Sequence, residues 1–147
     1  MNAAEWDHKD LWRKFGKDFM VEISRHSEGS TEDRDPWGEG PHRWCVYAYI
    51  YPKHPHFAAF SGLDMWQEGA TMMPLHGGPS FLAEPMRDGK VTSVQVGADY
   101  HHLYDDQYTQ CDTPEKAWSV FEDAQQLFDW LAVRAIQRAT TEAGKQP

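Results

Sequence analysis

The residues best suited to chemistry in this sequence are histidines and aspartates that follow a predicted strand. His102 stands three positions after Asp99 and three positions before Asp105, so a tight turn or a helix would bring the three side chains to one side. Imidazole and carboxylate groups together are ligands of divalent metals such as zinc, manganese and iron. A carboxylate beside an imidazole also orients the ring and raises its basicity for proton transfer.

Another histidine precedes two glycines in the segment His76-Gly77-Gly78. Glycines permit positive φ angles and close approach of the backbone to a ligand, so we expect His76 to project from a bend. The sequence predicts one cavity that binds a divalent metal ion or a small polar ligand, while the catalytic residues of any reaction stay unknown. The expected metal ligands are His76, Asp99, His102 and Asp105, and Gly77 and Gly78 complete the expected ligand-binding set.

Other interpretations of these residues stay open. Polar side chains after a strand often bind a neighbouring loop, and either His101 or His102 could be the one that acts. Cys111 could pair with one of these histidines as a nucleophile. The spacing is less specific than a CxxC pair or a helical HExxH motif, and there is no GxSxG elbow, Walker loop or GxGxxG motif.

Alternating and turn-forming segments predict the sheet that positions these residues. Residues 19–23 and 43–51 alternate as strands, and residues 80–83 read as a short strand. Asp88-Gly89 is typical of a hairpin turn, and it leads into a strand over residues 91–98. In the strand over residues 43–51 both faces are apolar. We expect a helix to cover the face of Trp44, Val46 and Ile50, and the segment 53–79 to cover the tyrosine face. The reverse assignment stays open, because both faces are apolar and the alternation only separates them.

Two helices are predicted, one near each end of the chain. The spacing of Trp6, Leu11, Trp12 and Phe15 favours a short helix over residues 6–16 that Gly16 ends. A long C-terminal helix starts after Thr113, a good N-cap, followed by Pro114. Its apolar stripe consists of Ala117, Val120, Phe121, Ala124, Leu127, Phe128 and Leu131. The expected fold class is therefore α+β, with a small antiparallel sheet and a long C-terminal helix packed on one face.

Length and charge narrow the class of protein. The 147 residues predict a single domain, with frayed ends at 1–5 and 140–147, an exposed acidic loop at 27–41 and an ordered irregular excursion at 53–79. A net charge of −9 without a lysine and arginine cluster argues against direct binding of nucleic acid. No apolar run is long enough for a membrane span, no signal peptide is evident, and two distant cysteines favour the reducing cytoplasm.

Three short motifs carry a resemblance over roughly residues 43–131. They are Tyr49-Ile50-Tyr51-Pro52-Lys53-His54-Pro55, His76-Gly77-Gly78, and Gly97-Ala98-Asp99-Tyr100-His101-His102-Leu103-Tyr104-Asp105, before a long helix. This order resembles a group of small uncharacterised phage and prophage proteins with an HGG and DxxHxxD pattern. Two departures are Pro79 after the glycines and the pair His101-His102 in place of a small residue and His. The resemblance implies a phage-type accessory protein in the host cytoplasm and a shared site, without implying a reaction.

Two functions from different classes follow from these observations. The first is a phage-type accessory protein whose His/Asp pocket binds a divalent metal or small polar ligand, with hydrolysis as a candidate reaction. The alternative is a non-enzymatic acidic inhibitor or adaptor that binds the basic surface of a host protein, for example an anti-defence protein. In a third, purely structural interpretation, the histidines and aspartates only tie loops to the sheet.

Overall fold

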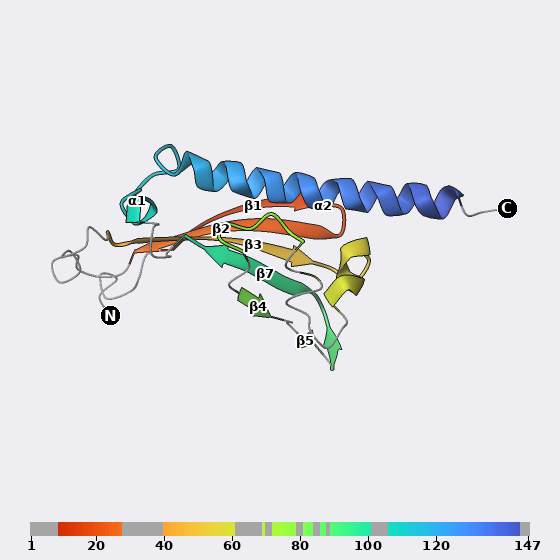
Figure 1. The fold of residues 1–147 in the computed structure, drawn as a ribbon. Helices are drawn as coiled ribbons and strands as arrows, with labels where there is room; N and C mark the ends of the chain where they lie inside the picture. The colour runs from red at the N-terminus through yellow and green to blue at the C-terminus, as the bar shows by residue number, and fades with distance from the viewer. Residues whose placement is uncertain are drawn as a thin grey trace.

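A computed structural model of the chain describes residues 9–27, 40–60, 69, 72–78, 81–83, 86–87, 89–100 and 106–144. An antiparallel sheet lies along a long C-terminal helix (Figure 1), so the predicted α+β class is confirmed. The strands are β1 (Lys9–Gly16), β2 (Phe19–Ser27), β3 (His42–Ile50), β4 (Phe81–Ala83), β5 (Met86–Arg87), β6 (Lys90–Val91) and β7 (Val94–Asp99). The helices are the 3-10 helix η2 (Pro55–Phe60), the short α1 (Asp106–Thr109) and the long α2 (Trp118–Gly144).

The main sheet has the strand order β1-β2-β3-β7-β4, and all of its neighbouring strands are antiparallel. β5 and β6 form a separate hairpin. At the centre of the main sheet, Val46 of β3 lies between Ile23 of β2 and Ala98 of β7. Because partners directly opposite each other point to the same side, these three side chains share one face of the sheet.

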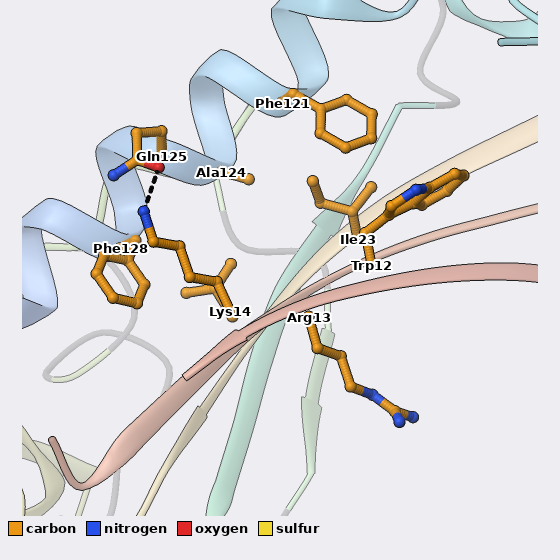
Figure 2. A pocket seen from close by; sticks show the side chains of 9 residues that line it. Trp12, Arg13, Lys14, Ile23, Phe121, Ala124, Gln125 and Phe128 are labelled. Carbon is orange, nitrogen blue, oxygen red and sulfur yellow. Dashed lines mark hydrogen bonds between the residues drawn. The ribbon is translucent and has the colours of Figure 1, made fainter. Parts of the chain in front are cut away.

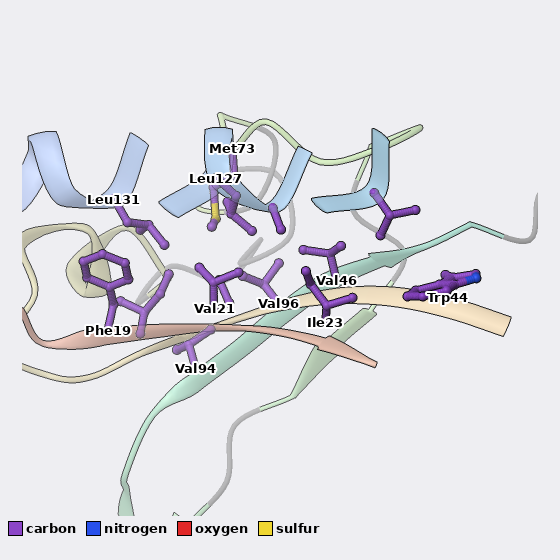
Figure 3. Packing of buried hydrophobic residues seen from close by; sticks show 14 of the residues in the cluster. Phe19, Val21, Ile23, Trp44, Val46, Met73, Val94, Val96, Leu127 and Leu131 are labelled. Atoms are coloured by element: carbon purple, nitrogen blue, oxygen red, sulfur yellow. The ribbon is translucent and has the colours of Figure 1, made fainter. Parts of the chain in front are cut away.

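The long helix α2 covers this face, and the side chains between helix and sheet form the core (Figure 3). Leu127 and Leu131 of α2 are fully buried, as are Trp44 and Ile50 of β3. The apolar stripe of the helix and the helix-facing side of β3 are therefore as predicted. Thr113 caps the turn that leads into α2, where its Oγ1 accepts a hydrogen bond from the Lys116 N–H at 3.3 Å.

The predicted N-terminal helix is wrong over the residues that the structure describes, because residues 9–16 form the edge strand β1. β1 pairs with β2 along its whole length through a tight turn, in which Asp18 has a left-handed φ of 64°. The ring of Trp12 stacks on Trp44 at 5.6 Å and meets Phe121 edge-on at 5.4 Å. A short apolar run is compatible with the period of a helix and with that of a strand. Here the segment forms a strand because it pairs with β2.

The described part of the 53–79 excursion packs on the side of α2, and not on the tyrosine face where we expected it. The ring Nε2 of His54 hydrogen-bonds the carbonyl of Leu131 at 2.9 Å. Met73 and Phe60 are buried in the same hydrophobic core as Leu127 (Figure 3). The described residues of the excursion thus add to the core on the side of the sheet that α2 covers.

The face away from α2 carries Cys45, Tyr47 and Tyr49, which are all half-buried. The ring of Tyr47 lies against Gly97 of β7, where a Cβ atom would stand 2.4 Å from Tyr47 Cδ1 and 2.5 Å from the Val46 oxygen. Only glycine fits there, and the flat contact helps to bury the ring.

Some predictions fall outside the described residues. These are the frayed segment 1–5 and, apart from Ser27 in β2 and residues 40–41, the acidic loop at 27–41. At the other end, α2 continues to Gly144, past residue 140 where fraying was expected. Within the described part of the chain, no helix is long and apolar enough to cross a membrane.

Candidate functional site

The predicted His76-Gly77-Gly78 bend forms a tight turn. The N–H of Gly78 donates to the Leu75 carbonyl at 3.0 Å, and the φ angles of Gly77 and Gly78 are 66° and 84°. Both angles lie in the left-handed region that glycine adopts without strain. The turn leaves His76 half-buried, with its ring stacked on that of Tyr100 at a centroid distance of 4.2 Å and an angle of 13°.

Tyr100 links His76 to a carboxylate that the sequence analysis did not select. The Tyr100 hydroxyl donates a hydrogen bond of 2.7 Å to Asp123 Oδ2 on α2, and the Tyr100 side chain is fully buried. Tyr108 closes the cluster with ring centroids 5.5 Å from His76 and 4.9 Å from Tyr100. Tyr100 therefore contacts both groups: its ring stacks on His76, and its hydroxyl binds the Asp123 carboxylate, on the α2 side of the sheet.

The other described member of the predicted metal set lies elsewhere. Asp99 pairs with Cys45 in the β3–β7 register, so it shares the face of Tyr47, away from α2. Burial raises the pKa of Tyr47, and the negative charge of Asp99 contributes to the rise. His76 and Asp99 are therefore on opposite faces of the sheet, and the structure does not bring them together. His102 and Asp105 lie outside the described residues.

Metal and nucleophile chemistry find little support among the described residues. No group of three histidine, cysteine or acidic side chains there is arranged to hold a metal ion. Cys111 Sγ donates to the Lys116 carbonyl at 3.4 Å, and burial raises the pKa of its thiol. A nucleophilic cysteine needs a lowered pKa, so the Cys111 pair is not favoured.

A second candidate site lies on α2, along the side that faces away from the core. We call the exposed side chains at positions 118, 122, 126, 129, 133 and 136 the outer stripe. They recur at intervals of three or four residues, so they lie along one side of the helix over roughly 27 Å. The members are Trp118, Glu122, Gln126, Asp129, Val133 and Ile136.

Large apolar side chains are unusually exposed in the outer stripe. Trp118 is 64% exposed at one end, and Val133 and Ile136 are 49% and 66% exposed at the other. The outer side of a helix that packs on a sheet is normally polar. Exposed apolar side chains gathered in one place commonly mark an interaction surface.

The middle of the outer stripe is acidic. Glu122 and Asp129 are exposed, and neither forms an ion pair with another described residue. Asp129 accepts a hydrogen bond of 2.9 Å from the Gln125 side-chain amide. The stripe therefore places two carboxylates between apolar ends.

The sequence contained signals for parts of both sites. Trp118, Val133 and Ile136 lie off the apolar stripe of the helix at helical spacing, which identifies them as outward-facing residues. For Asp123, no local pattern points to a contact with Tyr100, because the two residues meet only when α2 packs on the end of β7. Comparisons with protein families, curated proteins and solved structures find no match for this chain.

Proposed function

We propose that the protein is a non-enzymatic acidic adaptor that binds a basic surface of another protein through the outer stripe of α2. The observation that carries this proposal is the exposure of Trp118, Val133 and Ile136 on the same helix side as Glu122 and Asp129. Buried aromatic and aliphatic anchors supply most of the affinity in protein interfaces. Carboxylates supply attraction to a cationic partner and speed the encounter.

The proposed partner surface is an apolar groove or helix flanked by lysine and arginine. The net charge of −9 disfavours pairing of two copies of this acidic chain and favours a basic partner. The partner that we propose is a host protein with a basic surface, and an anti-defence role is one example of such an interaction. We place this interaction in the cytoplasm, where Cys45 and Cys111 remain thiols, as they are in the structure.

A defined basic probe tests the proposal without a known partner. The probe is a fluorescently labelled synthetic helix with a leucine stripe flanked by lysines, titrated with the full chain and followed by anisotropy. The double variant E122Q/D129N should weaken binding about tenfold at low ionic strength, because two charge pairs are lost. This difference should shrink as salt rises from about 50 mM to about 300 mM.

Matched variants separate the outer stripe from net charge. D112N/E115Q also removes two carboxylate charges, but outside the stripe, and one of them is already paired with Lys116 at 2.9 Å. It should change binding less than about twofold, since exposed charges outside a contact contribute little. W118A should weaken binding at all salt concentrations. Equal losses in both double variants, or no binding by the wild type, would contradict the proposal. Thermal melting of each variant verifies that the fold is kept.

A pocket for a divalent metal or a small polar ligand is the second candidate function. The observation in its favour is the ring of His76, which Tyr100 and the Gly77-Gly78 turn hold in place near the Tyr100–Asp123 bond. Calorimetric titration with zinc or manganese tests this candidate. One bound ion per chain, lost in H76A but kept in D99N, would support it, because Asp99 lies on the other face. A wild type that binds neither metal would contradict it.

A further inference from the structure

A cleft opens between α2 and the first two strands, on the side of the sheet that bears the core (Figure 2). Its volume is about 140 Å³. The apolar lining consists of Trp12, Val21, Ile23, Phe121, Ala124 and Phe128. An apolar cavity of about 150 Å³ accepts a molecule of the size of benzene, so this cleft has room for one six-membered ring.

The cleft also contains a cation. Lys14 follows Trp12 on the side of β1 that faces α2, and its Nζ donates to the Gln125 side-chain oxygen at 2.9 Å. The same Nζ lies 4.5 Å from the centroid of the Phe128 ring. Both of these partners are neutral, and Lys14 forms no ion pair with another described residue.

The neighbouring arginine does not share this role. Arg13 points to the opposite face of the sheet (Figure 2), where its Nε pairs with Glu22 Oε2 at 2.8 Å. Asp129 orients the side-chain amide of Gln125, because Asp129 accepts a hydrogen bond from Gln125 Nε2. The Gln125 Oε1 atom is therefore turned toward Lys14. Arg13 also contributes to the lining of the cleft, but its guanidinium points away, so Lys14 is the residue whose charged group faces α2, where its partner is a neutral oxygen.

We propose that this cleft binds a small aromatic carboxylate of the size of benzoate. The ring enters between Trp12, Phe121 and Phe128, which offer ring faces and edges to an aromatic ligand. The carboxylate accepts a hydrogen bond from Lys14 Nζ in place of the Gln125 oxygen. Charge-assisted hydrogen bonds are stronger than neutral ones, so a carboxylate is a better partner for Lys14 than the Gln125 amide oxygen.

Benzoate and its neutral analogue benzamide test the proposal on the full chain, with affinities measured by NMR titration. The wild type should bind benzoate about tenfold more tightly than benzamide, because only benzoate is charged. K14M should remove this preference and leave the affinity for benzamide within about twofold. K17M, which removes a lysine from the turn of the same hairpin, should keep the preference.

A further variant places the ligand in the cleft. A124M adds a longer side chain to the lining and should weaken both compounds by about tenfold, while the melting curve shows that the variant folds. Equal affinity of the wild type for benzoate and benzamide would overturn the proposal, as would an unchanged preference in K14M. In either case Lys14 acts only as an inward-facing charge that protects an edge strand from pairing with other chains.

Discussion

At the scale of single residues, His54 and His56 serve packing rather than metal or acid–base chemistry. The N–H of His56 donates to His54 Nδ1 at 3.0 Å, so the other ring nitrogen of His54 carries the proton that it donates to Leu131. His56 Nε2 hydrogen-bonds the Gly69 carbonyl at 2.8 Å, and its ring meets Trp130 edge-on at 4.7 Å. Both rings are buried against α2, and burial lowers the pKa of His56.

We expect the free energy of unfolding to decrease as the pH falls from about 7.5 to about 5.5. Burial lowers the pKa of His56 in the folded protein, whereas the unfolded chain has the ordinary value of about 6.5. Below that value the unfolded state therefore takes up a proton that the folded state resists. Above it both states are neutral, and the effect vanishes.

Urea denaturation at several pH values measures this effect in the wild type and in H56Q. The variant has no titratable ring at this position, so its stability should depend less on pH. Part of the pH dependence of stability should remain in H56Q, because the pKa of His42 is lowered as well. Burial is the main cause of that lowering, and the positive charge of Arg25 adds to it. Identical pH profiles for the wild type and H56Q would contradict the assignment to His56.

At the scale of elements, α2 has two sides with different tasks. One side carries Val120, Leu127 and Leu131, which are fully buried against the sheet. The opposite side carries the outer stripe, in which the apolar ends stay exposed. A helix that only covered a sheet would need the buried side alone. The adaptor proposal explains why the outer stripe also carries large apolar side chains.

Alanine substitutions distinguish the two sides of α2. L127A should lower the free energy of unfolding by roughly 2–5 kcal/mol, the range for large-to-small changes in a packed core. Q126A removes an exposed side chain from the neighbouring position and should change it by less than about 0.5 kcal/mol. F121A should cost less than L127A, because Phe121 is half-buried beside the cleft. Denaturant unfolding gives all three values, and equal losses would mean that the helical phase is wrong.

At the scale of the whole molecule, charge is unevenly distributed. The chain is acidic overall, with Glu122 and Asp129 on the outer stripe, yet the β1–β2 hairpin carries exposed Arg13, Lys14 and Lys17. The two proposals therefore require ligands of opposite charge at separate places. E122Q should leave the preference for benzoate intact, because Glu122 does not line the cleft. K14M should leave binding of the basic helix intact, so failure of one proposal does not decide the other.

The sequence by itself determined the elements whose patterns are long and local. The apolar stripe predicts α2, although the helix begins at Trp118 and not directly after Thr113. The alternation around residues 19–23 and 43–51 predicts β2 and β3, and the strand expected over 91–98 is divided between β6 and β7. The turn of His76 also follows from the two glycines after it. In each case, residues that are close together along the chain show the hydrophobic period or the backbone preference of the element that they form.

Only the tertiary structure decided the features that depend on distant partners. β1 is a strand because β2 pairs with it, and the start of the excursion is held on the side of α2, where the Leu131 carbonyl accepts a hydrogen bond from His54. Asp99 and His76 are apart because Asp99 follows the strand alternation to one face, while His76 reaches Tyr100 on the other. Contacts between such distant residues leave no period in the sequence, so composition and spacing alone could not predict them.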